Sequence, residues 1–139
     1  MNEELETRLT AVTGAAAFEK RGAELWMDAP ALDVPTAASL LLEHGARLST
    51  MTAIALEDGE TEVIYHYAKA SWACHLRTRT VGNRLPSITP VTPAADWIER
   101  EIMDLYAVTF TGHPNPVRLL RPIQLNPGYY RELGGKARR

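Results

Sequence analysis

The sequence predicts an α+β fold in which helices pack on a mostly antiparallel, four-stranded sheet. Segments with helical and with alternating periodicity follow one another in the order αβαβββα, and consecutive strand-like runs favour antiparallel neighbours. The length of 139 residues, with 45% hydrophobic and 23% charged residues, is typical of one soluble domain. We expect a single domain over residues 1–120 and an irregular tail over 121–139, which ends in a disordered "LGGKARR".

The first half of the chain supplies two helices and one strand. Residues 3–12 carry leucine and valine at helical spacing behind an acidic first turn, so they predict a helix. Residues 17–27 partly alternate between apolar and polar side chains and predict a strand. A loop over 28–35 then leads into a second helix, which has Pro35 just inside its start and ends at His44-Gly45.

Three further strands are predicted in the centre of the chain. They cover residues 48–56, 63–70 and 72–81, which are rich in β-branched and aromatic side chains or alternate in polarity. Asp58-Gly59, between the first two, is a favoured centre for a tight hairpin turn. These strands therefore form the antiparallel part of the predicted sheet.

The third helix follows a proline-rich connection over 82–91 and begins at Thr92-Pro93. Four apolar residues share one face, which we expect to anchor the helix on the sheet: Ile98, Ile102, Leu105 and Tyr106. A second face carries one aromatic and three charged residues: Trp97, Arg100, Glu101 and Asp104. Such a face is typical either of a solvated surface with a local Arg100–Asp104 pair or of contact with another protein.

Charge and cysteine content exclude several functional classes. A net charge of −2, with no basic block beyond Arg138-Arg139, gives no field that would attract nucleic acid. The single cysteine, Cys74, cannot form an internal disulfide and is typical of a reducing compartment. The acidic start is unlike a secretory signal, and the apolar runs are too short to span a bilayer. We therefore expect a cytoplasmic protein that meets a membrane only through a partner.

The sequence also lacks the motifs that hold common cofactors. It has no cysteine cluster for iron and sulfur and no glycine-rich turn for a nucleotide, so we expect no cofactor. His66 and His75, on neighbouring predicted strands, are a candidate metal pair. Two histidines without a third ligand are more typical of a sheet surface, which is the interpretation we favour.

Residues 99–120, "EREIMDLYAVTFTGHPNPVRLL", resemble the signature of the 30-kilodalton subunit family of complex I. In bacteria this is the C subunit of NADH:quinone oxidoreductase, and membrane-bound nickel–iron hydrogenases contain relatives. The resemblance identifies the following residues as family signature and candidate subunit interface: Trp97, Glu99, Arg100, Glu101, Asp104, His113, Pro114 and Arg118. Val117 departs from the pattern, which usually has a basic residue there, and Ala107 stands where many members have glycine.

The resemblance implies a cofactor-free, non-catalytic subunit of the peripheral arm. Its partners would be the large subunit, of the 49 kDa or hydrogenase type, and the iron–sulfur subunits through which electrons pass to quinone or protons. It would lie in the cytoplasm, peripheral to the inner face of the cell membrane. The short segment after Leu120 is more similar to the small subunits of energy-converting hydrogenases, and the choice between the two complexes stays open.

Two other functions fit the same residues. A small acid–base enzyme would use Glu99, Glu101 or Asp104 with His113 as its partner, although no nucleophile or pocket is apparent. A free-standing α+β binding module is the other alternative. His113 itself is either a proton carrier or, as we favour, a turn histidine bonded to the backbone or to a nearby acid such as Asp104.

Overall fold

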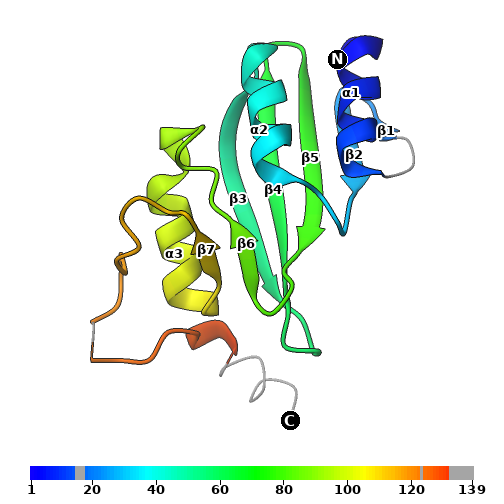
Figure 1. Ribbon diagram of the computed structural model, residues 1–139. Coiled ribbons are helices and arrows are strands. Elements are labelled where there is room, and N and C mark those ends of the chain that lie inside the picture. The colour runs from blue at the N-terminus through cyan, green and yellow to red at the C-terminus, as the bar shows by residue number, and fades with distance from the viewer. Residues whose placement is uncertain (15–17, 123, 132–139) are drawn as a thin grey trace.

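The computed structural model describes residues 1–14, 18–122 and 124–131, and its fold is of the predicted α+β class (Figure 1). The predicted disorder of "LGGKARR" lies outside the described residues. The elements follow one another along the chain as α1 Glu3–Thr13, β1 Glu19–Arg21, β2 Glu24–Asp28, α2 Val34–Glu43, β3 Arg47–Ala55, β4 Thr61–Lys69, β5 Trp72–Arg79, β6 Arg84–Pro86, the 3-10 turn η1 Pro93–Ala95, α3 Asp96–Tyr106 and β7 Thr109–Thr111.

The main sheet is five-stranded and mixed, so the predicted number of four strands was wrong, whereas the mostly antiparallel pairing is confirmed for three of the four strand pairs. The strand order is β1-β2-β5-β4-β3. Neighbours are antiparallel except β2 and β5, which run parallel. The extra strand arises because the predicted strand over 17–27 is broken at Gly22, whose positive φ of 64° turns the chain into a short hairpin.

One face of this sheet is covered by helices. Met27, Leu76, Tyr65 and Met51 lie opposite one another across four strands, and all four are buried. Figure 1 shows α1 and α2 on the same side of the sheet. Leu5, Leu9 and Leu41 from these helices are at most 1% exposed and belong to the same core. Alternation along each strand thus directs every second side chain into this core.

Side-chain caps begin α1 and α2, whereas the predicted cap Thr92 forms no side-chain cap bond and opens the turn η1, so α3 begins at Asp96 and not at Thr92-Pro93. The Asn2 side chain accepts a hydrogen bond from the amide of Leu5, and Asp33 accepts one from Thr36 at the start of α2. Gly14, with φ of 61°, ends α1. None of the helices in the described part of the chain is long and apolar enough to cross a membrane.

A second, two-stranded sheet accompanies α3. β6 and β7 run parallel, with Leu85 opposite Phe110, and both side chains are buried. The sequence predicted an irregular connection here, because a three-residue strand is too short to show alternation. This small sheet places the turns on either side of α3 next to that helix, and so it positions the signature residues.

Candidate functional site

The helix α3 has a different neighbour on each of its sides. Glu99 faces the loop after β6, and Asp104 faces the segment that follows β7. Ile98, Ile102 and Leu105 face β3. Trp97, 67% exposed, and Glu101 point outward. The predicted apolar anchor is only partly right: Ile102 is buried, but Ile98, Leu105 and Tyr106 are half-buried, because a groove separates them from β3.

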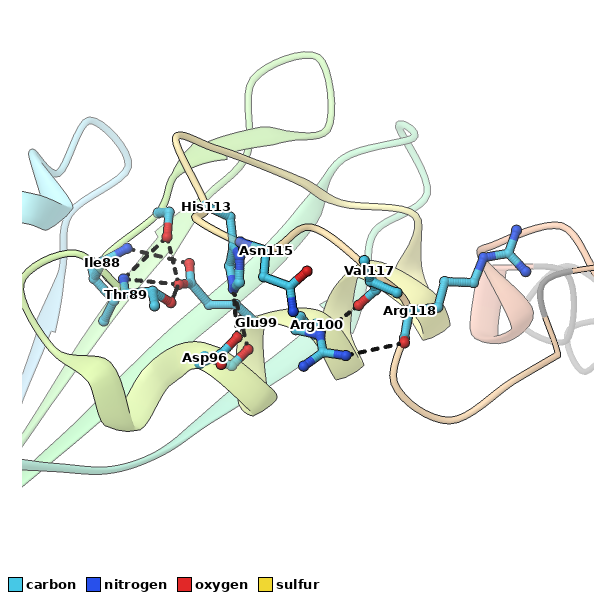
Figure 2. A network of polar contacts seen from close by, with 10 residues as sticks. Ile88, Thr89, Asp96, Glu99, Arg100, His113, Asn115, Val117 and Arg118 are labelled. Atoms are coloured by element: carbon cyan, nitrogen blue, oxygen red, sulfur yellow. Dashed lines mark hydrogen bonds and ion pairs between the residues drawn. The ribbon is translucent and has the colours of Figure 1, made fainter.

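Glu99 is fully buried and holds the loop after β6 (Figure 2). Its carboxylate accepts hydrogen bonds from the Ser87 hydroxyl at 2.8 Å, the Thr89 amide at 3.1 Å and the Ile88 amide at 3.3 Å. The Thr89 hydroxyl donates a further bond. Burial raises the pKa of Glu99, and the bonds from Thr89, Ser87 and Ile88 oppose that rise. This carboxylate therefore acts as a clamp between α3 and residues 87–89.

Asp104 plays the same part on another side of α3. It is 0% exposed, and its Oδ2 accepts hydrogen bonds from the amides of Arg121 at 2.7 Å and Leu120 at 3.3 Å. Its own carbonyl accepts a bond from the Gly128 amide at 2.8 Å. The outward stripe expected from helical spacing is therefore interrupted at Asp104, because a later segment of the chain folds over it.

Arg100 also bonds to that later segment instead of pairing with Asp104. Its Nε donates to the carbonyl of Val117 at 2.6 Å, and Nη2 donates to that of Arg118 at 3.4 Å (Figure 2). The expected Arg100–Asp104 pair is not formed. A guanidinium suits this role because its several N–H groups can reach two carbonyl oxygens at once.

His113 is a buried turn histidine, as we expected, but its acidic neighbour is Asp96. The Asn115 amide donates to Nδ1 at 2.9 Å, so this nitrogen carries no proton. Nε2 lies 3.2 Å from Asp96 Oδ1, and the His113 side chain is 0% exposed (Figure 2). Sequence reasoning did not single out Asp96. It stands in the first turn of α3, where an acid is common at a helix start and gives no sign of a distant partner.

Arginine side chains hold the segment after β7 in place. Arg118 donates through Nη1 to the carbonyls of Pro122, at 3.0 Å, and Leu125. Arg121 donates to the carbonyl of Asn126 at 3.0 Å and lies over the ring of Tyr129. Arg131 donates to the carbonyl of Tyr106 at 2.9 Å and to two side chains near β4, Thr61 and Asn83. Only Arg118 was among the predicted site residues.

The remaining signature residues, together with Val117 and Leu120, form an exposed surface around α3. We call the following residues the α3 surface: Trp97, Glu101, Pro114, Val117 and Leu120. Trp97, Val117 and Leu120 are 67%, 52% and 60% exposed, which is unusual for large apolar side chains in one region. Pro114 and Pro116 restrict the backbone of this segment, so its shape is largely fixed before any partner arrives.

His66 and His75 lie together on the face of the main sheet opposite α1 and α2. Their Nδ1 atoms are 2.7 Å apart, and the Thr52 hydroxyl lies 2.8 Å from His66 Nε2. Trp26 stacks on His75 with ring centroids 4.2 Å apart. Among the described residues, no group of three or more histidine, cysteine, aspartate or glutamate side chains could hold a metal ion. The stacking on Trp26 makes His75 part of the packing on this sheet face.

Comparison with known proteins agrees with the resemblance of the signature. Residues 27–129 match the protein family described as "Respiratory-chain NADH dehydrogenase, 30 Kd subunit". The C subunit of the NADH-quinone oxidoreductase of Mesorhizobium japonicum is 44% identical over 62 residues, covering 42% of this chain and 31% of that protein. The corresponding protein of Ruegeria pomeroyi is 34% identical over 86 residues, covering 56% and 43%.

A fungal relative matches a similar share of the chain. The mitochondrial 30.4 kDa subunit of NADH-ubiquinone oxidoreductase from Neurospora crassa is 35% identical over 79 residues, covering 53% of this chain and 28% of that protein. The chain therefore spans less than half of the length of each of these three relatives.

Two solved structures share the fold at low sequence identity. One belongs to an archaeal membrane-bound sulfane sulfur reductase, with a TM-score of 0.68, 22% identity and coverage of 92% of this chain and 79% of that one. The other is a trypsin-resistant fragment of Nqo5, with a TM-score of 0.61, 21% identity and coverage of 81% and 94%. Because the family match spans well over half of the sequence, the chain belongs to the family of the 30 kDa subunit of respiratory-chain NADH dehydrogenase.

Proposed function

We propose that the chain is a non-catalytic, cofactor-free subunit in the peripheral arm of a complex I-type NADH:quinone oxidoreductase. It braces the large catalytic subunit, beside the iron–sulfur subunits, during electron transfer to quinone. The α3 surface makes the contact, and the protein reaches the inner face of the cell membrane only through the assembled complex. Curated bacterial and fungal relatives named as subunits of this enzyme support the assignment.

The observation that carries the proposal is the inward orientation of the signature acids. Glu99 and Asp104 are both 0% exposed and bond to backbone amides of the chain itself. A general acid or base must come within hydrogen-bonding reach of a substrate, which such burial prevents. Among the described residues, the ion-pair partner of His113 is Asp96. The signature acids thus fix the local structure around α3, and a subunit that braces another one requires such a rigid region.

The α3 surface has the properties of a contact region. Tryptophan is enriched among the residues that contribute most to binding, and Trp97 is held on a rigid helix with its side chain exposed. The Glu99 and Asp104 clamps fix the segments on either side of that helix. A surface ordered in advance loses less conformational entropy on docking, so the same contacts give a higher affinity.

A second assignment is to a related membrane complex of the hydrogenase type. The structural neighbour in an archaeal respiratory sulfane sulfur reductase shows that this fold also occurs in a complex of another kind. Mass spectrometry of the large subunit that co-purifies with the tagged chain distinguishes the two assignments. A large subunit with cysteines placed to bind nickel and iron would favour the hydrogenase type.

Replacement of the exposed tryptophan tests the contact directly. We expect Trp97→Ala to reduce recovery of the large subunit by about tenfold or more. The free energy of unfolding of the isolated chain should stay within about 0.5 kcal/mol of the parent value, because the side chain is largely exposed. Val81→Ala removes another exposed apolar side chain and should change neither quantity. Purification as a lone monomer without redox subunits would instead indicate a free-standing binding module.

A further inference from the structure

The two edges of the main sheet differ in how they are protected against another strand. β1 forms one edge with three residues, Glu19, Lys20 and Arg21, all charged and exposed. β3 forms the other edge with nine residues, of which only Arg47 is charged. Short, charged edges resist pairing with foreign strands, whereas long, uncharged edges accept them. The edge at β3 therefore lacks the short length and the charge that protect the edge at β1, and its bulge lies at one end, between Leu48 and Thr50.

A groove of about 360 Å³ runs between β3 and α3. Four consecutive residues of β3, 50–53, line one wall. Because consecutive strand residues point to opposite faces, a cavity that touches all four lies along the edge of the strand. The rest of the groove is lined by Tyr130 and by residues of α3: Ile98, Glu101, Ile102, Leu105 and Tyr106. Figure 1 shows α3 beside the β3 edge.

The backbone of β3 has free hydrogen-bonding groups along this groove. Among the described strands, β3 pairs with β4 alone, so alternate residues direct their N–H and C=O groups away from the sheet. Among the residues that the structure describes, no backbone hydrogen bond reaches residues 47–55 apart from those of the ladder with β4. An extended segment beside the strand would satisfy these groups with main-chain hydrogen bonds.

The opposite wall offers apolar contacts and one negative charge. Ile98 and Leu105 are half-buried, so each keeps apolar surface exposed to the groove. Glu101 is exposed and forms no ion pair with any described residue. A lysine or arginine on an occupant would therefore complement this wall.

We propose that this groove receives an extended strand from a neighbouring subunit. Its backbone pairs with the outer edge of β3, its apolar side chains pack on Ile98 and Leu105, and one basic side chain pairs with Glu101. A second copy of the same chain fits less well, because a twofold contact through the groove would bring two Glu101 carboxylates towards one centre. The identity of the neighbour as a subunit of the same complex rests on the function proposed above.

Hydrogen exchange on the assembled complex tests the pairing. The tagged chain is purified with its natural partners, and its amide exchange is compared with that of the isolated chain. We expect alternate amides within residues 50–55 to exchange about tenfold or more slowly in the complex, because a paired amide exchanges only when the strand opens. Unchanged exchange at these amides in an intact complex would overturn the proposal and leave the proposed function standing.

Two substitutions on the edge supply an independent measurement. Thr50→Lys and Ile54→Lys place charges at exposed positions of β3, and each should reduce recovery of the partner at least about fivefold. Val81→Lys, at a residue 79% exposed, is the matched control and should have no effect. Equal recovery for all three variants, or a dimer of the isolated chain with protected β3 amides, would overturn the proposal. Failure to recover any redox partner would overturn the proposed function as well.

Discussion

The main sheet and the α3 region are held together by different kinds of interaction. In the sheet region, Tyr65 and Leu76 of the strands and Leu41 of α2 are at most 1% exposed and belong to a continuous apolar core. Around α3, Ile102 and Phe110 extend that core, and Glu99 and Asp104 add bonds to backbone amides of neighbouring segments. The first arrangement depends on many interchangeable contacts and the second on a few directed ones. Predictions about stability and pH can therefore separate the two regions.

The largest effect is expected in the core of the sheet region. Leu41→Ala removes a side chain of α2 that is 0% exposed, and we expect it to lower the free energy of unfolding by about 2–5 kcal/mol. Leu42→Ala, at the adjacent residue, which is 51% exposed, is the control and should change it by less than about 0.5 kcal/mol. Chemical denaturation measures both. Similar losses for the two variants would contradict the assignment of Leu41 to the core.

A smaller but still substantial effect is expected at the Glu99 clamp. Glu99→Ala leaves the buried amides of Ile88 and Thr89 without their acceptor, and we expect a loss of about 2–3 kcal/mol in the free energy of unfolding. Glu101→Ala, on the exposed side of the same helix, should cost less than about 0.5 kcal/mol. A clamp is also local, so amide exchange should accelerate most at residues 87–89. Uniform acceleration over the whole chain would contradict it.

The smallest effect is a difference in pH dependence between two carboxylates. Burial raises the pKa of Glu99 above its ordinary 4.5, so the folded protein holds this proton more tightly than the unfolded chain. The contribution of Glu99 to stability is therefore greatest below pH 4.5 and declines as the pH rises through the folded pKa. The free energy of unfolding is measured against pH for the parent and for Glu99→Gln, and the difference between the two curves should isolate this decline.

Glu60 should show the opposite sign. Hydrogen bonds from Thr80, Asn83 and Gly82 lower its pKa below the ordinary 4.5. Its contribution is therefore present above pH 4.5 and is lost as the pH falls through the folded pKa. Glu60→Gln provides the matching difference curve. If the difference curves of Glu99→Gln and Glu60→Gln changed with pH in the same direction, burial would not be the dominant influence on the pKa of Glu99.

Periodicity in the sequence predicted the sheet region well and the α3 region only in part. The central strands β3, β4 and β5 lie within two residues of their predicted limits, because each is long enough to show its pattern. β1, β6 and β7 have three residues each, which cannot establish a period. The parallel pairing of β2 with β5 was missed for another reason, since pairing partners distant in sequence leave no local signal.

At the candidate site, too, the sequence pattern predicted local features but not contacts between distant segments. Helical spacing placed Trp97 and Glu101 correctly on the outside of α3. It could not show that residues 117–121 return to cover Arg100 and Asp104. Helical spacing gives the direction in which a side chain points, but not which distant segment of the chain lies there. The burial of Glu99 likewise depends on the loop at 87–89, which no pattern in the helix reveals.

The parallel pairing of β2 with β5 has a consequence for the order of assembly. Leu25 lies opposite Cys74, so this contact closes a long stretch of chain, whereas β3, β4 and β5 join through short turns. During synthesis the β1–β2 hairpin leaves the ribosome well before its docking strand exists. It must therefore remain outside the main sheet until β5 has been made, and only then can it complete that sheet.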